Sequence, residues 1–303
     1  MGEIMIIKVE NIHKKYGREP ILNGVSFEIT FPTITALVAP NGSGKSTLMN
    51  IITNLEKFDK GSVEIMGMKN TDPVIFKHIS YMQDNSVLYN HLTGYDHLQF
   101  IAEVHSVPKK QLLELITYIG IDSYIHKKVK QYSLGMKQHL LLTMALINKP
   151  KLLILDEPLN GLDPTSSIRV RELLLQLKNE GTTVLLSSHN LAEVDQVTSD
   201  ILFLKDGKLI SENLKNNQTA FYMMNVQPLD KAINVLNNTK VGFSAVDTSI
   251  KVEITKKEQL NFILKQFYES EIEITDISRQ SVGSEARYNE LFNKEQNHAK
   301  PII

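Results

Sequence analysis

One short segment of the chain combines small residues with a lysine and two hydroxyl side chains. It reads Ala-Pro-Asn-Gly-Ser-Gly-Lys-Ser-Thr over residues 39–47, between an apolar run at 34–38 and a helical pattern that starts at Leu48. Backbone N–H groups at the start of a helix bind phosphate oxygens, and glycines let the backbone approach them closely. The pattern predicts a phosphate-binding loop with Lys45 on the phosphates and the Ser46 hydroxyl on Mg²⁺. The expected nucleotide contacts are Pro40, Asn41, Gly42, Ser43, Gly44, Lys45, Ser46 and Thr47.

The first position of this loop departs from the usual pattern. Such loops read G-x-x-x-x-G-K-S, whereas this chain has Ala39 followed by Pro40. A residue before proline is pushed towards extended backbone with negative φ. We therefore expect Ala39 to end the strand with negative φ and a buried methyl group. The positions that need glycine should be Gly42 and Gly44.

Two adjacent carboxylates follow a second apolar run. Residues 152–155 read Leu-Leu-Ile-Leu, and Asp156 and Glu157 come directly after them. Ligands of α/β sheets bind at the carboxyl ends of the strands, where these side chains would lie. We expect Asp156 to hold Mg²⁺ through water, and Glu157 to orient or deprotonate an attacking water.

The composition of the chain excludes several classes of protein. The chain has 303 residues, which suggests about two domains. Its 33 basic and 34 acidic residues give a net charge of −1, so the basic surface of a dedicated nucleic-acid binder is not expected. Cysteine is absent, which excludes disulfides, thiolate metal sites and cysteine nucleophiles. No apolar run reaches the roughly 18 residues of a membrane-spanning helix, and we expect no leader peptide.

The elements that must position these residues alternate between strands and helices, which predicts an α/β fold. Residues 95–148 are helical in pattern, broken at Pro108 and near Gly120 and Gly135, and predict a helical subdomain at about 90–150. A polar stretch at 215–218 predicts a linker that ends a domain of residues 1–215. Strands are expected at 5–9, 25–29, 34–38, 61–65, 79–82, 152–155 and 183–187, helices at 166–179 and 191–197, and a hairpin at 201–211.

The remaining chain predicts a small α+β domain over residues 216–293. Its pattern gives strand, helix, strand, strand, helix and strand, which is the order of a ferredoxin-like domain. The ranges are 221–226, 229–236, 243–246, 250–254, 257–268 and 272–277, with a turn at 247–249. Residues 294–303 are polar, and we expect a flexible tail.

Further motifs resemble those of one ATPase family. Residues 132–138, Tyr-Ser-Leu-Gly-Met-Lys-Gln, resemble the signature loop of ABC ATPases, and residues 160–163, Asn-Gly-Leu-Asp, resemble their D-loop. His189 resembles their switch histidine, and Tyr16 resembles the aromatic residue that stacks on adenine. Because the motifs follow in the family's order, residues 1 to about 215 are identified as resembling an ABC nucleotide-binding domain, a P-loop NTPase.

The resemblance implies a function and partners. In the family, two such domains face each other head to tail with ATP between them, as a homodimer or heterodimer. Ser133 and Gly135 would act on the ATP of the opposite subunit, and Asp163 would belong to the same site. The resemblance further implies a separate membrane permease, an exporter of the drug, bacteriocin or antibiotic-resistance branch, and a cytoplasmic position at the inner face of the membrane. ATP and Mg²⁺ are the implied cofactors, with Glu157 and His189 catalytic.

Three alternatives stay open at the level of sequence. The family's Q-loop glutamine corresponds either to Gln83 or, in the ungapped register that we favour, to Asp84, and either could be a metal ligand. The chain could instead be an ABC ATPase that acts on ribosomes or DNA without a permease. It could also bind ATP without turnover, as Ala39 and Asp84 would suggest.

Overall fold

The computed structural model describes residues 5–30, 32–214, 220–239, 241–246, 249–255, 257–281 and 283–292. Its contacts divide the chain into two compact units, Met1–Glu212 and Asn213–Ile303. The predicted linker at 215–218, most of the turn at 247–249 and the predicted tail at 294–303 lie outside the described residues.

The first unit contains an antiparallel sheet with the strand order β2-β1-β4-β5. Its strands are β1 (Ile7–Tyr16), β2 (Glu19–Ile29), β4 (Lys60–Ile65) and β5 (Met68–Lys69). β1 and β2 form a long hairpin in which Tyr16 pairs with Glu19. This pairing places Tyr16 at the tip of β1.

A second sheet of the same unit has the strand order β10-β9-β3-β8-β7-β6. Its strands are β3 (Ile34–Val38), β6 (Ile79–Met82), β7 (Leu152–Leu155), β8 (Thr183–Ser188), β9 (Asp200–Lys205) and β10 (Lys208–Asn213). The pairs β6–β7, β7–β8, β8–β3 and β3–β9 are all parallel. The carboxyl ends of β3, β7 and β8 therefore meet at one edge, which is where the phosphate loop and the Asp156–Glu157 pair begin.

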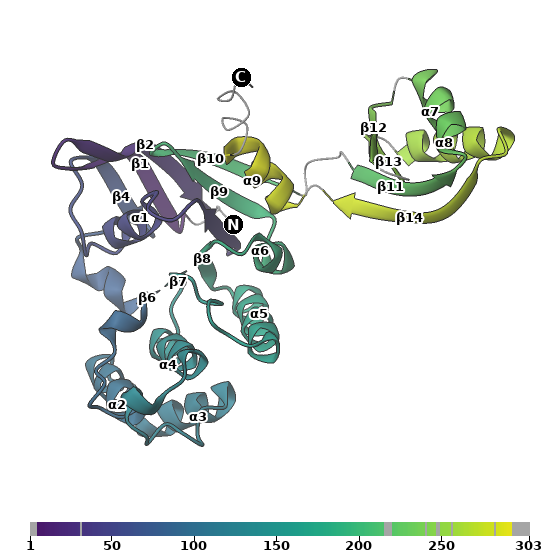
Figure 1. Ribbon diagram of the computed structural model, residues 1–303. Coiled ribbons are helices and arrows are strands. Elements are labelled where there is room, and N and C mark those ends of the chain that lie inside the picture. Colours follow the sequence, from purple (N-terminus) through teal and green to yellow (C-terminus); the bar gives the residue numbers. More distant parts are fainter. Residues whose placement is uncertain are drawn as a thin grey trace, which may run out of the picture. The chain divides into compact units, whose positions relative to one another are not determined.

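Helices surround this sheet, and α2, α3 and α4 form a separate helical group, as Figure 1 shows. Side chains near the first turns fix several helix starts: Thr93 and Asp96 form a capping box on α2, Ser133 caps α4 and Asp163 caps α5. The bounds are α1 (Lys45–Ile52), α2 (Gly94–Val104), α3 (Lys109–Ile119), α4 (Leu134–Leu146), α5 (Pro164–Asn179) and α6 (Leu191–Val197), with short 3₁₀ turns at Pro73–Lys77, Asn85–Val87 and Val129–Gln131.

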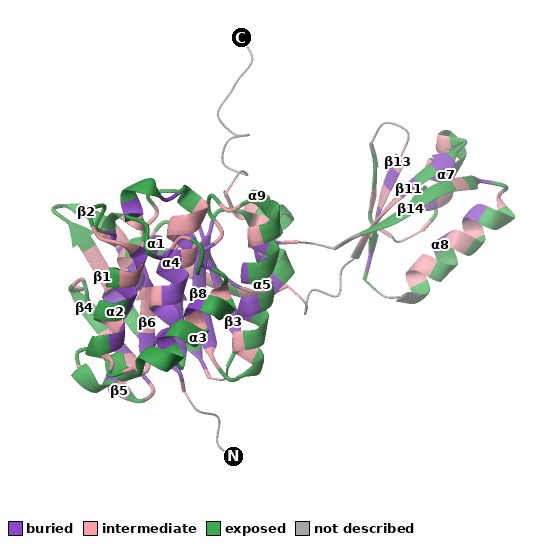
Figure 2. Cartoon of the chain, turned by 90° about the horizontal axis from the view of Figure 1, so that it is seen from below, coloured by how far each residue is buried: buried purple, intermediate pink, exposed green. Residues whose placement is uncertain are grey.

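The core of the first unit lies between the two sheets and around α1. Every residue of β3, β7 and β8 is buried, whereas the antiparallel strand β2 alternates at its end, and Figure 2 shows the buried residues on β3 and β8. Parallel strands covered on both faces require such continuous apolar runs. The resulting rigid platform holds the loops at its carboxyl edge.

The second unit follows the order β11-α7-β12-β13-α8-β14. Its antiparallel sheet has the order β12-β13-β11-β14, and the buried side chains Ile263 and Phe267 of α8 pack with Met224 and Val226 of β11. The bounds are β11 (Ala220–Gln227), α7 (Leu229–Asn237), β12 (Phe243–Val246), β13 (Ser249–Ile254), α8 (Lys257–Glu269), β14 (Glu273–Ser281) and α9 (Ser284–Phe292).

The observed elements confirm the α/β class of the first unit and correct several boundaries. β1 extends to Tyr16 and β2 begins at Glu19, beyond the expected ranges 5–9 and 25–29. The expected break near Gly135 is observed as the start of α4 at Leu134, where Ser133 supplies the N-cap and Gly135 lies in the first turn. Helix α9 was not expected.

Candidate functional site

A cavity of about 560 Å³ lies at the carboxyl edge of the parallel sheet, and the loops that follow β3, β6 and β7 contribute to its lining. It collects most of the predicted nucleotide and metal residues, although they come from distant parts of the sequence. Those that line it are Tyr16, Asn41, Gly42, Gly44, Lys45, Ser46, Thr47, Asp84, Asp156 and Glu157. Leu134 and Gln138 of the 132–138 motif and Asn160 of the 160–163 motif line it as well, as do Ile21 and Asn85, which belong to no predicted motif.

The phosphate loop has the backbone that its glycines permit. Gly42 and Gly44 have φ values of 78° and 101°, in the left-handed region that other residues avoid. Ala39 is not among the described non-glycine residues with positive φ, and it is 2% exposed within the hydrophobic core. The expectation for Ala39 is therefore confirmed: its methyl group packs in the core and imposes no left-handed strain.

Lys45 begins α1 and is buried at the base of the loop. Its Nζ donates to the carbonyl oxygens of Ala39 at 2.7 Å and Pro40 at 3.2 Å. Burial lowers the pKa of Lys45, and the nearby carboxylates of Glu157 and Asp156 oppose that shift. A positive charge is thus held directly beneath the loop that would receive phosphate oxygens.

Ser46 and Asp156 meet across the two strand ends. The Ser46 hydroxyl donates to Asp156 Oδ2 at 2.8 Å, and the Ser187 hydroxyl donates to Asp156 Oδ1 at 2.5 Å. The backbone N–H of Asp156 donates to the carbonyl oxygen of Met82. Both carboxylate oxygens and the backbone of Asp156 are therefore fixed.

This donor set fits Mg²⁺. Mg²⁺ favours oxygen ligands and is held by one or two protein groups together with substrate phosphates and water. The oxygens of Ser46 and Asp156 lie next to the phosphate loop, which would supply the remaining ligands from a nucleotide. Among the described residues, no cluster of three or more histidines and carboxylates could hold a metal without such a substrate.

Glu157 lies next to Asp156 and contacts the predicted switch histidine. His189 Nδ1 lies 2.8 Å from Glu157 Oε2, and the backbone N–H of His189 donates to the same oxygen at 3.3 Å. An ionised carboxylate only accepts hydrogen bonds, so Nδ1 carries the proton of this contact. Glu157 has a φ of 50°, and its N–H donates to the Ser187 hydroxyl at 2.9 Å.

Tyr16 lies at the rim of the cavity, and two charged residues hold it. Its hydroxyl donates to Glu56, which also pairs with Lys14 at 2.8 Å. The Lys14 ammonium lies 5.0 Å from the centre of the Tyr16 ring. The ring is half exposed, which leaves aromatic surface for a base to stack on.

Ser133, Gly135 and Asp163 do not themselves line the cavity, although Leu134, between the first two, does. Ser133 Oγ accepts from the N–H of Met136, and Asp163 accepts from the N–H groups of Thr165 and Ser166. A Cβ at Gly135 would lie 3.7 Å from the carbonyl oxygen of Gly161. Both loops are thus capped helix starts, and each contributes a neighbouring residue, Leu134 or Asn160, to the cavity that holds the phosphate loop.

Gln83 and Asp84 face different spaces. Asp84 lines the nucleotide cavity, where its carboxylate accepts from the N–H of Ser86, and the hydrogen bonds from Ser86 hold the pKa of Asp84 below its usual range. Gln83 lines a separate groove of about 420 Å³ with the exposed side chains of Phe76, Phe100 and Val104.

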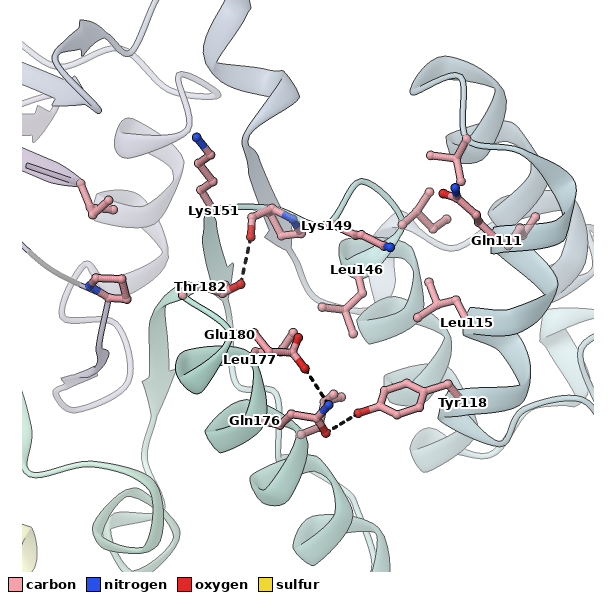
Figure 3. Close-up of a pocket in the computed structure, with 18 of the residues that line it drawn as sticks. Gln111, Leu115, Tyr118, Leu146, Lys149, Lys151, Gln176, Leu177, Glu180 and Thr182 are labelled. Carbon is pink, nitrogen blue, oxygen red and sulfur yellow. Dashed lines mark hydrogen bonds between the residues drawn. The ribbon is translucent and has the colours of Figure 1, made fainter. Parts of the chain in front are cut away.

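A larger cavity, about 780 Å³, lies between α3 and α5. In Figure 3, Tyr118 of α3 points towards Gln176 of α5, and its hydroxyl donates to Gln176 Oε1 at 2.7 Å. Leucines of α3, α4 and α5 supply much of the wall. None of the predicted site residues lines this cavity, so the chemistry is assigned to the smaller one.

Sequence reasoning missed Ser187, which contacts both Asp156 and Glu157. No motif marks it, but its position could have been inferred from the strand that ends just before His189. It missed Gln138 too, which is buried and has a carbonyl oxygen without a hydrogen-bond partner among the described residues.

Comparisons with known proteins agree with this geometry. A family model described as ABC transporter matches residues 22–160, and one described as AAA domain, putative AbiEii toxin, matches residues 127–195. The lantibiotic transport ATP-binding protein SrtF of Streptococcus pyogenes is 39% identical over 226 residues, 71% of this chain and 98% of its own. The bacitracin transport ATP-binding protein BcrA of Enterococcus faecalis is 34% identical over 214 residues, 68% of each chain.

Solved structures agree as well. A dimeric ATP-binding cassette in a post-hydrolysis state, bound to ADP and phosphate, matches with a TM-score of 0.62 and 26% identity, over 69% of this chain and 98% of that one. The relatives span nearly the whole ATP-binding unit, and the phosphate loop, the Asp156–Glu157 pair and His189 meet as that chemistry requires. The chain therefore belongs to the ABC transporter family, as one of its ATP-hydrolysing, ATP-binding subunits.

Proposed function

We propose that this chain powers an exporter by binding and hydrolysing Mg-ATP in the cavity around the phosphate loop. Lys45 binds the phosphates, Ser46 and Asp156 hold Mg²⁺, and Tyr16 stacks on the base. Glu157 takes the proton of the attacking water, and His189 orients Glu157. The observation that carries the proposal is the convergence of Ser46, Asp156, Glu157 and His189 within hydrogen-bond distance.

Each residue has a definite part in this reaction. Bound Mg²⁺ would neutralise charge that develops on the phosphate oxygens. Asp156 is held by two hydroxyl donors, so it enters the site already oriented. Glu157 Oε2 accepts from His189, which supports Glu157 as the base and His189 as the group that orients it.

Two chains would complete each site. Ser133 and Gly135 lie at the start of α4 and do not line the cavity of their own chain, although Leu134 between them does. A partner subunit facing head to tail would place its own signature loop over this phosphate loop. The dimeric arrangement named for the solved relative supports this assembly.

The exposed groove beside Gln83 favours a permease as the partner. Phe76, Phe100 and Val104 are 40%, 67% and 65% exposed and line one groove, an arrangement that favours protein docking. The relatives named for lantibiotic and bacitracin transport support an exporter of such antibiotics. None of the described helices is long and apolar enough to cross a membrane. We therefore propose that a separate permease holds the chain at the inner membrane face.

We also propose the domain boundaries of the chain. Residues 1–215 form the ATP-binding domain, with the helical group at about 90–150, and residues 216–293 form a small accessory domain. The order β11-α7-β12-β13-α8-β14 supports the second domain as ferredoxin-like.

The proposal is tested in two steps. The purified chain should release phosphate from ATP only when Mg²⁺ is present. From detergent-solubilised membranes, the tagged chain should capture its permease, and Phe100→Asp should abolish this capture while ATP binding remains. Leu113→Asp, an exposed change on α3 outside the groove, is the matched control. Equal capture by both variants would contradict the groove as the docking site.

A further inference from the structure

Ser187 is a buried hydroxyl that contacts both carboxylate residues of the site. It lies near the end of β8, is 0% exposed, and does not line the nucleotide cavity. Its Oγ donates to Asp156 Oδ1 at 2.5 Å and accepts from the N–H of Glu157 at 2.9 Å. A serine hydroxyl has one donor and two acceptor positions, so both bonds form at once.

The first bond fixes the carboxylate that would hold the metal. Asp156 Oδ2 accepts from Ser46, which itself is a proposed metal ligand. Asp156 Oδ1 accepts from Ser187, which is buried in the sheet and cannot reach the nucleotide. When Ser46 turns to a metal, Ser187 is the hydroxyl that still orients Asp156.

The second bond fixes the backbone of the proposed base. Glu157 has a φ of 50°, a left-handed conformation that is unfavourable for a residue with a side chain. Its N–H is held by Ser187 and its carboxylate by His189. Without the Ser187 hydroxyl, the peptide between Asp156 and Glu157 loses the partner that holds it in this conformation.

We propose that Ser187 is a positioning residue for ATP hydrolysis. Its hydroxyl aligns Asp156 for Mg²⁺ and Glu157 for the attacking water, and it takes no part in holding the nucleotide itself. The inference rests on the proposed function of this site. It predicts that removal of the hydroxyl lowers turnover and the affinity for Mg²⁺, while nucleotide affinity measured without metal stays the same.

The main test is Ser187→Ala, which removes only the hydroxyl. Loss of a group that orients a metal ligand costs about 10–100-fold in activity or metal affinity. We expect kcat to fall by that factor and the Mg²⁺ concentration for half-maximal activity to rise. The affinity for a fluorescent ATP analogue in EDTA should stay within about twofold, because Ser187 is not in the phosphate loop. Steady-state phosphate release at several Mg²⁺ concentrations measures the first two quantities.

A second pair of variants separates the hydroxyl from packing. Ser187→Thr and Ser187→Val have the same shape and differ only in the hydroxyl. The kcat of Ser187→Thr should be at least about tenfold above that of Ser187→Val, even if the added methyl group lowers the kcat of both variants. Thr183→Val is the matched control, since Thr183 is buried on the same strand and its hydroxyl has no partner among the described residues. It should retain parental turnover and Mg²⁺ dependence.

The outcomes distinguish this inference from the proposed function. If the parent hydrolyses Mg-ATP and Glu157→Gln does not, the proposed function stands. Equal turnover in the Thr and Val variants, with an unchanged Mg²⁺ requirement in the Ala variant, would then overturn the role of Ser187 alone. A parent without Mg²⁺-dependent hydrolysis would instead overturn the proposed function.

Discussion

Ala39 replaces a glycine that phosphate loops usually carry, and the structure predicts what restoring that glycine would do. The Ala39 methyl group lies in the hydrophobic core at 2% exposure, and its backbone lacks positive φ. Ala39→Gly removes about one buried methyl group, worth about 0.8 kcal/mol. Glycine also gives the unfolded chain more conformational freedom, which lowers the free energy of unfolding by roughly a further 0.4–1 kcal/mol. We expect a loss of about 1–2 kcal/mol in the free energy of unfolding, with ATP affinity unchanged.

The reverse change at Gly42 should behave differently. Gly42 has a φ of 78° and lines the nucleotide cavity, so Gly42→Ala would strain the loop by about 1–2 kcal/mol. A Cβ there meets no atom within 4 Å, so the loss comes from backbone strain alone. Both variants should therefore lose similar stability, but only Gly42→Ala should bind ATP more weakly.

Urea unfolding and titration with a fluorescent ATP analogue test this pair. Ala39→Gly should lower the midpoint of unfolding without changing its slope, since the change is local. Tighter ATP binding by Ala39→Gly, or higher stability, would show that Ala39 does strain the loop and would refute the reasoning.

Three further predictions concern Lys45, Ser133 and His139. Lys45→Met should weaken ATP binding about 10–100-fold by removing charge-assisted bonds, and calorimetric titration showing parental affinity would contradict this. Ser133→Arg in the Glu157→Gln background should leave ATP binding intact but prevent the ATP-dependent dimer, and size-exclusion chromatography that still shows a dimer would refute the head-to-tail site. Burial lowers the pKa of His139 from 6.5, so its contribution to stability is present above pH 6.5 and is lost as the pH falls below it. The melting temperature of His139→Asn should therefore fall less than that of the parent between pH 7.5 and 5.5, and parallel curves would contradict this.

Local chemistry explains which parts of the site the sequence predicted. The phosphate loop and the Asp156–Glu157 pair are each contiguous, and each follows an apolar run that forms a buried strand. Because parallel strands end at a common edge, the meeting of Ser46 with Asp156 could be expected from topology. The observed 2.8 Å contact joins residues 110 positions apart.

Other features depend on register and could not be predicted from the sequence. β7 pairs with β8 so that Leu155 lies beside Leu186, and this register brings Ser187 to the residues after β7. A shift of one residue would place its hydroxyl on the other face of the sheet. The break expected near Gly135 is the start of α4 at Leu134, and the exact residue is set by the Ser133 cap, which leaves Gly135 in the first turn.

The different positions of Gln83 and Asp84 also depend on which way each side chain points from the backbone. Adjacent residues point to opposite sides of an extended chain, so one lines the nucleotide cavity and the other the groove with Phe100. The ungapped register places Asp84 at the glutamine position of the family. Asp84 as the metal-side residue and Gln83 as the groove-side residue stay predictions.

Single-turnover ATP hydrolysis by Glu157→Gln tests most directly whether Glu157 is the base that activates water. Glutamine keeps the shape of the side chain but cannot accept the proton of the attacking water. Loss of a general base costs about 10²–10⁴-fold in rate. We expect a rate reduced by this factor, parental affinity for Mg-ATP, and a dimer that persists as long as ATP is bound. Hydrolysis at the parental rate would contradict the role of Glu157 as the base, because the water would then be activated without it.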